Sequence, residues 1–190
     1  TRQKSYAPLK VAKFGGTSMA DTQAMKRSAN VALDNGASVI VVSATSGTTN
    51  QLLKMADLGQ TDPQAMTQLR EEVIERHRRL ATELECRQEA LDQLEELYTE
   101  LWTLTEGICL LKDCHPKTLD NLVSLGERLS SQIFAECLFH QLSIMESSFS
   151  DAHCFDVREV MKTDSHHGKA NPQFTEISKR SLKLREALED

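Results

Sequence analysis

The stretch LKVAKFGGTS at residues 9–18 decides the fold that this sequence predicts. Residues 9–14 have the composition of a short β-strand, and the paired glycines that follow indicate a turn. We expect a helix after that turn, because Asp21 suits the N-cap and Gly36 suits the position just beyond a last turn near Asn35. A strand that leads directly into a helix is typical of the opening of a parallel α/β fold.

Residues 38–44, SVIVVSA, predict a second strand, because four consecutive β-branched residues lie between turn-forming residues. A continuous apolar run of this kind is typical of a strand that is buried on both faces of a parallel sheet. Strand, helix and strand then form a βαβ unit with a right-handed crossover. We therefore expect an α/β fold with a largely parallel sheet.

The composition excludes several classes of protein. The chain has 190 residues, of which 39% are hydrophobic and 26% are charged, and this balance indicates one globular domain rather than a disordered chain. The net charge is −6, so the basic excess of a typical nucleic-acid binder is missing. No apolar run approaches the about 20 residues of a membrane span, and the basic N-terminus lacks the apolar core of a signal peptide.

The cysteines indicate a reducing compartment. Their number is five, which is odd, and no C-x-x-C pair occurs, so we expect no disulfide framework and a cytoplasmic location. The residues that could be imagined as a zinc set are Cys109, Cys114, His115, His153 and Cys154. Their spacings match no common zinc pattern, and the sequence therefore predicts no metal site.

The rest of the chain is mainly helical in pattern. Residues 63–111 predict two amphipathic helices that form a hairpin with a break near Cys86, because leucines recur at helical spacing on both sides of it. A further helix is predicted over residues 118–142 and a last one over residues 173–188. Residues 150–155, SDAHCF, predict a third strand between these two helices.

The segment KFGGTS at residues 13–18 is the first candidate site, because it follows the first strand at the edge where open α/β sheets bind ligands. Gly15 and Gly16 would let backbone N–H groups approach a phosphate closely, and Lys13 would place a positive charge on it. The alternative is an ordinary glycine turn with a surface lysine. The P-loop and dinucleotide-binding patterns are both absent.

The hydroxyl-rich segment SATSGTTN at residues 43–50 is the second candidate site. It follows the second strand, so parallel pairing would bring it to the same edge of the sheet as the first segment. Five hydroxyl groups and one amide within eight residues would suit a small polar ligand. The alternative is a turn whose side chains bond only to their own backbone.

Glu127, in VSLGERLSS at residues 123–131, is the third candidate. Helical spacing places Glu127 at the margin of the apolar stripe, where a carboxylate needs a partner. A substrate ammonium, a backbone amide or an arginine would each serve, and a structural ion pair is the common case. The neighbouring Gly126 weakens the helix by about 1 kcal/mol relative to alanine, which points to close approach by another backbone or by a ligand.

Four segments together resemble the aspartokinase family. They are KFGGTS at 13–18, SATSGTTN at 43–50, VSLGERLSS at 123–131 and FDVREVM at 155–161. Their order, spacing and strand–loop contexts match, and the long helical insert is most similar to the lysine-sensitive type. The resemblance implies the amino-acid kinase fold, an α/β/α sandwich around a largely parallel sheet. On this interpretation residues 1–190 are the N-terminal, amino-acid-binding part of the catalytic domain, with residues 63–111 as its insert.

The resemblance also implies a reaction and a set of roles. Aspartate kinases transfer a phosphoryl group from ATP, with Mg²⁺, to the β-carboxylate of L-aspartate, at the start of the route to lysine, threonine and methionine. Lys13 would be the catalytic residue, and the phosphate-binding positions would be Lys13, Gly15, Gly16, Thr17 and Ser18. The aspartate-binding positions would be Ser43, Thr49 and Glu127. Glu127 would hold the α-ammonium group of the substrate.

The sequence departs from the family pattern after Leu188. A glycine-rich GRGGSD-type segment, the nucleotide-binding lobe and the regulatory ACT domains would follow there, so we expect this chain alone to be inactive. Lysine inhibition is not carried over, because the residues that would bind lysine are missing. We expect a homo-oligomer that has no nucleic-acid or membrane partner. Two alternatives stay open, a different amino-acid kinase, such as a glutamate or carbamate kinase, and a non-catalytic aspartate-binding or assembly module.

Overall fold

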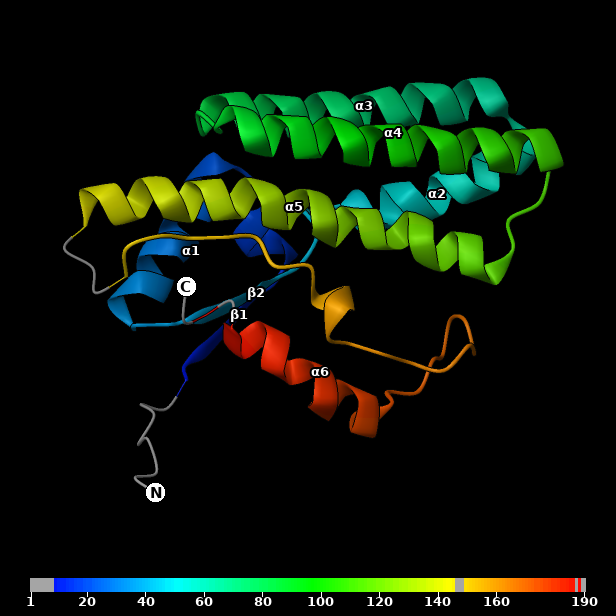
Figure 1. Cartoon of the computed structure of the whole chain (residues 1–190). Coiled ribbons are helices and arrows are strands. Elements are labelled where there is room, and N and C mark those ends of the chain that lie inside the picture. Colours follow the sequence, from blue (N-terminus) through cyan, green and yellow to red (C-terminus); the bar gives the residue numbers. More distant parts are fainter. Residues whose placement is uncertain (1–8, 146–148, 187, 189–190) are drawn as a thin grey trace.

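The computed structural model describes residues 9–145, 149–186 and 188, and Figure 1 shows their arrangement. The strands and short turns are β1 (Val11–Phe14), η1 (Gly16–Met19), β2 (Val39–Val42) and η2 (Val157–Glu159). The helices are α1 (Thr22–Asp34), α2 (Thr48–Thr61), α3 (Pro63–Glu83), α4 (Gln88–Leu111), α5 (Pro116–Ile144) and α6 (Phe174–Glu186). The α/β class predicted from the sequence is therefore confirmed.

β1 and β2 form a parallel pair that α1 connects, as the βαβ pattern predicts. Val11 lies opposite Val39 and Phe14 lies opposite Val42, so both strands end at the same edge of the sheet. The Asp21 side chain accepts the amide of Ala24 at 2.7 Å, which confirms its role as the cap of α1. The sheet has two strands within the described residues.

One face of this sheet is covered and the other is open to solvent within the described residues. Phe14, Ile40 and Val42 pack against the hydrophobic core that α1 and α5 share. Val11 on the opposite face is 63% exposed and Val41 is 47% exposed. The prediction that the second strand is buried on both faces is therefore wrong, because the described part of the chain supplies a helical layer on one side only.

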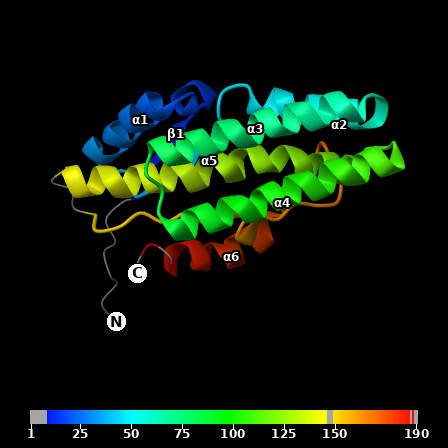
Figure 2. The same ribbon diagram turned by 90° about the horizontal axis from the view of Figure 1, so that it is seen from above.

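α5 is the central helix of the structure. It contacts α1, α2, α3 and α4, and Figure 2 shows it running through the middle of the helical layers. α2 is not predicted from the sequence, because the hydroxyl-rich run from Thr48 to Asn50 has the composition of a ligand-binding loop. The buried positions of α2 include Gly59 and the small Ala56, so its apolar stripe is weak in the sequence.

The hairpin predicted over residues 63–111 is present as α3 and α4. Asp62 caps the start of α3 by accepting the amide of Ala65 at 3.1 Å. α3 ends at Glu83 and α4 begins at Gln88, which confirms the predicted break near Cys86. The hairpin lies against α2 and α5, on the far side of these helices from the sheet (Figure 1).

The predicted strand at residues 150–155 is absent from the described structure. This segment is extended but pairs with no strand there, and it runs along α5 instead (Figure 1). Ala152 packs against the hydrophobic core, and the Cys154 thiol lies 3.5 Å from the Ser131 hydroxyl. The segment therefore has the extended backbone expected of a strand but packs on a helix instead of pairing in a sheet. The last helix was expected over residues 173–188 and is α6, which has no buried residue.

Three of the exclusions made from the sequence can be compared with the described residues. All five cysteines are free thiols. Within the same part of the chain, no three acidic, histidine or cysteine side chains are grouped so that they could hold a metal ion. Nor does any helix there have both the length and the apolar character needed to cross a membrane.

An ion pair between the exposed Arg87 and the buried Glu136 fastens the turn between α3 and α4 to α5. The Glu136 side chain is 6% exposed, and its carboxylate accepts hydrogen bonds from the Arg87 guanidinium at 2.8 and 2.9 Å. The backbone amide of Arg87 donates a further bond at 2.9 Å. Burial opposes ionisation of Glu136, but these hydrogen bonds outweigh it and hold the pKa of its carboxyl below its usual range.

We expect the Arg87→Met variant to lower the free energy of unfolding by about 1–3 kcal/mol, because it leaves the buried Glu136 carboxylate short of donors. Arg78→Met is the matched control, since Arg78 pairs with Glu95 on the exposed surface of the same hairpin. The control is expected to lose less than about 1 kcal/mol. Urea denaturation of both variants makes the comparison, and equal losses would contradict the assignment.

Candidate functional site

The loops that follow β1 and β2 lie in contact. The amide of Ser43 donates to the carbonyl of Phe14 at 3.1 Å, which extends the strand pairing by one residue. A Cβ atom on Gly16 would lie 3.4 Å from the carbonyl oxygen of Ala44 and 3.9 Å from the Cα of Ser46. The two candidate segments are therefore neighbours at one edge of the sheet, as the parallel pairing predicts.

Lys13 lies at the exposed end of β1. Its ammonium is 4.0 Å from the position that a Cβ atom of Gly15 would occupy, so the side chain reaches over the first glycine of the loop. Beyond the glycines, the chain folds into η1, where the amide of Ser18 donates to the carbonyl of Gly15 at 3.0 Å. No ion pair involves Lys13 within the part of the chain that the structure describes, and its charge is open to an anionic ligand.

Glu127 reaches the second loop from α5. Its Oε1 atom accepts the backbone amide of Ala44 at 3.3 Å. The Ser130 hydroxyl, one turn further along α5, donates to the carbonyl of Ser43 at 2.6 Å. The sequence leaves three partners open for Glu127: a substrate ammonium, a backbone amide or an arginine. The structure contains the backbone amide. The adjacent arginine, Arg128, pairs with Glu100 instead.

The absence of a side chain at Gly126 allows α5 to come this close to the loop. A Cβ atom at Gly126 would lie 2.9 Å from the Cβ of Ala44 and 3.6 Å from the Cγ2 of Thr48. Ala44 is 2% exposed and Thr48 is fully buried, so neither has room to move away. The prediction that Gly126 marks a close approach by another part of the chain is confirmed.

Ser43 and Thr49 flank the buried part of this loop, and both are partly exposed. α2 begins at Thr48, directly after Gly47, whose φ of +82° suits glycine. Thr49 is therefore in the first turn of a helix rather than in a loop. Neither hydroxyl group makes a hydrogen bond within the described residues, so both can bind a ligand.

A second set of polar side chains holds this loop from the helical hairpin, and the sequence analysis missed it. Arg76 of α3 contacts the hydroxyl groups of both Thr45 and Thr48, which are 2.5 Å from one another, and His77 contacts the hydroxyl of Thr45. His77 is fully buried. Its signal in the sequence is its position on the apolar stripe of α3, four residues after Val73, where a buried histidine requires a polar partner from elsewhere in the fold.

Burial lowers the pKa of His77 to about 4, and the nearby Arg76 charge adds to this effect. A backbone hydrogen bond to Val73 acts in the opposite direction and is too weak to compensate. His77 is therefore neutral at pH 7. Its Nδ1 atom lies 2.7 Å from the carbonyl of Val73 and donates to it, which leaves Nε2 as a hydrogen-bond acceptor.

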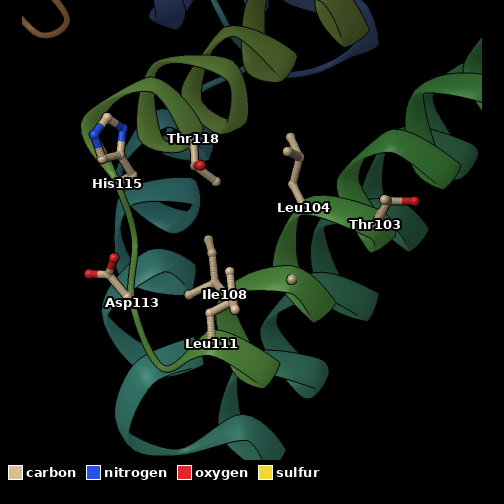
Figure 3. A pocket seen from close by; sticks show the side chains of 8 residues that line it. Thr103, Leu104, Ile108, Leu111, Asp113, His115 and Thr118 are labelled. Carbon is tan, nitrogen blue, oxygen red and sulfur yellow. The ribbon is translucent and has the colours of Figure 1, made fainter.

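Among the depressions of the surface, one borders the candidate site. A groove of about 290 Å³ lies between the β1–α1 loop and α1, and its lining includes Thr17, Ser18 and Arg27. A cavity of about 220 Å³ lies between the end of α4 and the start of α5 (Figure 3). Leu104, Ile108 and several polar residues line the second cavity, but none of the predicted site residues does.

Comparison with known proteins assigns the family. The protein-family model described as the amino acid kinase family matches residues 8–181. The chain belongs to the amino acid kinase family. The match covers both glycine-containing loops, the helical hairpin and Glu127, so the whole candidate site lies within the family domain. The fold class expected from the resemblance is confirmed.

Relatives within the amino acid kinase family are aspartokinases. The lysine-sensitive aspartokinase 3 of Escherichia coli K12 is 32% identical over 174 residues, which are 88% of this chain and 35% of that protein. The E. coli aspartokinase III structure in complex with aspartate and ADP has a TM-score of 0.81 at 29% identity, and covers 96% of this chain and 39% of that one. The aspartate kinase of Clostridium acetobutylicum shares the fold, with a TM-score of 0.61 at 18% identity. The chain spans roughly a quarter to a third of the length of its curated relatives.

Alanine is expected to have opposite effects on the stability of the fold at Gly126, which is tightly packed, and at Gly107, which is not. Gly126→Ala is expected to destabilise the fold by about 1–3 kcal/mol, because the new methyl group would overlap Ala44. Gly107→Ala is the control, since Gly107 lies in α4 with nothing within 4 Å of its added Cβ. Alanine there should stabilise the helix by about 1 kcal/mol. Thermal unfolding measures the change in stability of both variants. Stabilisation by Gly126→Ala would contradict the close packing at this position.

The neutral state of His77 predicts a pH dependence of stability. The pKa of His77 is about 4 in the folded chain and about 6.5 in the unfolded one, so between these values the unfolded chain binds more protons. The resulting stability is fully present above pH 6.5 and is lost as the pH falls towards 4, by at most about 3 kcal/mol.

Urea denaturation between pH 7 and pH 4 measures this effect. His77→Gln should remove that component of the pH slope, whereas His153→Gln, which replaces an exposed histidine, should retain it. Equal slopes for wild type and His77→Gln would show that His77 is not held neutral by burial.

Proposed function

We propose that this chain is the amino-acid-binding part of an aspartate kinase, which transfers a phosphoryl group from ATP to the β-carboxylate of L-aspartate and forms 4-phospho-L-aspartate and ADP. The observation that carries this proposal is the meeting of Glu127 with the hydroxyl-rich loop at Ala44, beside the loop of Lys13 and the two glycines. A carboxylate for a substrate ammonium and a cation for a phosphoryl group thus share one edge of the sheet. The similarity to a protein solved with aspartate and ADP supports the choice of substrates.

Each candidate residue has a role in this proposal. Glu127 binds the α-ammonium of L-aspartate with the part of its carboxylate that does not accept the Ala44 amide. The hydroxyl groups of Ser43 and Thr49 orient the substrate carboxylates. Lys13 stabilises the negative charge that is redistributed over the transferred phosphoryl group. The backbone amides of the loop provide the remaining phosphate contacts, and the positions involved are Gly15, Gly16, Thr17 and Ser18.

The chemistry of this reaction requires no general base. The attacking β-carboxylate has a pKa of about 3.9 in free aspartate, so it is ionised at pH 7 and no proton has to be removed. The protein has to align two anions and offset their repulsion. Lysine, backbone amides and a metal–nucleotide complex are sufficient for this task.

Mg²⁺ enters this proposal as part of the substrate. The described residues contain no cluster of acidic, histidine or cysteine side chains that could hold the ion by themselves. The ion would therefore arrive bound to the phosphates of ATP. Lys13 and the glycine loop would contact this complex through its phosphate oxygens.

The same proposal includes the cellular location, the pathway and the assembly of the protein. We expect it to act in the cytoplasm, in the biosynthesis of lysine and the related amino acids, since soluble substrates and free thiols suit that compartment. We also expect it to form a homo-oligomer. The open face of the sheet, with Val11 and Val41 exposed, is one apolar surface that assembly would cover.

Calorimetric titration of the purified chain with L-aspartate and with L-glutamate tests the substrate. We expect L-aspartate to bind at least tenfold more tightly, because the Ala44 loop is packed against α5 at Gly126 and has no room to shift for a longer side chain. Tighter binding of L-glutamate would favour a different amino-acid kinase. Binding of L-aspartate without phosphoryl transfer in the protein that carries this segment would favour a binding module. Binding of neither amino acid would contradict the proposal.

Two substitutions separate the roles of Glu127 and Lys13. Glu127→Gln keeps an acceptor for the Ala44 amide but loses the charge, so it should weaken L-aspartate binding by about 10- to 100-fold. Lys13→Ala should leave that affinity within about twofold but lower kcat by about 10²–10³-fold in the protein that carries this segment. Calorimetry, steady-state kinetics and a melting curve are recorded for both variants. If Glu127→Gln melts early and binds L-aspartate normally, Glu127 is a structural residue only.

A further inference from the structure

We propose that Arg76 and His77, on the helical hairpin, are positioning residues for the amino-acid site, because they hold the loop that carries Ala44 and Thr49 against Glu127. This inference rests on the proposed function for its link to L-aspartate. Its structural basis is independent of that function. Through these two residues the helical hairpin affects substrate affinity, although neither Arg76 nor His77 is placed to touch the substrate.

His77 holds the loop through the Thr45 hydroxyl. Because its Nδ1 atom donates to the carbonyl of Val73, its Nε2 atom accepts, and the Thr45 hydroxyl lies 3.2 Å from it. His77 is fully buried and Thr45 is 2% exposed, so water cannot replace either partner. Loss of this bond would leave the buried Nε2 atom of His77 without its hydrogen-bond donor.

Arg76 holds the same loop from the next position of α3. Its guanidinium donates to the carbonyl of Ser46 at 3.0 Å, to the hydroxyl of Thr45 at 3.0 Å and to the hydroxyl of Thr48. Both terminal nitrogens are thus used by the loop. This arrangement is that of a structural clamp rather than of an arginine open to a substrate carboxylate.

The clamp acts directly beside the residues assigned to the site. Ala44, whose amide Glu127 accepts, precedes Thr45, and Thr49 follows Thr48. On the opposite side the loop packs against α5 at Gly126. The loop is therefore fixed between α3 and α5. Gly47 within it would otherwise allow many backbone conformations.

Paired substitutions test whether the bonds, rather than the bulk of the side chains, hold the loop. Thr45→Val removes the hydroxyl at nearly constant volume, and Thr45→Ser keeps it. His77→Asn can retain the bond to Val73 but is too short for Thr45, whereas His77→Gln extends to the position of Nε2. Arg78→Met serves as the control, because Arg78 lies on the same helix and pairs with Glu95 on α4.

The measurements are amide hydrogen exchange at Ala44 and Thr48, and calorimetric titration with L-aspartate, both on the purified 190-residue chain. We expect Thr45→Val and His77→Asn to speed exchange at least tenfold and to weaken L-aspartate binding at least tenfold at a temperature where each variant is folded. Thr45→Ser, His77→Gln and the Arg78→Met control should stay within about threefold of wild type in both measurements.

Each result decides a separate point. Unchanged exchange in Thr45→Val and His77→Asn would overturn the clamp. Faster exchange with unchanged L-aspartate affinity would overturn the positioning role. Equal losses in Arg78→Met would show a general effect of hairpin stability and would also overturn it. A wild-type chain that binds no L-aspartate would contradict the proposed function, and the exchange comparison would still decide whether the bonds of Thr45 to Arg76 and His77 hold the loop.

Discussion

Ala44 donates its backbone amide to the carboxylate of Glu127 across 83 residues of sequence, and the rest of the structure is arranged around this contact. The contact requires α5 to lie almost against the loop that follows β2, which glycine at position 126 permits. It also requires the loop to keep one conformation. The parallel pairing of β1 with β2 then brings the lysine- and glycine-containing loop beside it.

The helical hairpin of α3 and α4 has two functions in this arrangement. It buries apolar side chains such as Val73 and Leu94 in the common core. It also supplies Arg76 and His77, the polar partners of a loop whose hydroxyl groups are buried. A buried hydroxyl without a partner is costly, so a loop of this composition folds stably only where another element satisfies it.

Parts of the fold could be predicted because their signals are local. The N-cap at Asp21, the β-branched run of β2 and the leucine spacing of the hairpin each depend on neighbours within a few residues. α2 was missed because hydroxyl-rich residues at its start resemble a loop and Gly59 interrupts its apolar stripe. The strand expected at residues 150–155 failed for the opposite reason. The segment is extended, but a strand needs a hydrogen-bonding partner, and this segment packs on α5 instead.

The candidate site likewise has features that the sequence predicts and contacts that only the tertiary structure reveals. Local sequence was enough to single out Lys13, the two glycines, the hydroxyl-rich loop and Glu127, because the ends of parallel strands and the margins of helices are defined by short-range patterns. The backbone partner of Glu127 and the loop contacts of Arg76 and His77 were decided only by tertiary structure. These contacts join residues that are about 30 or more positions apart, and no local pattern specifies which distant amide or hydroxyl a buried polar side chain will meet.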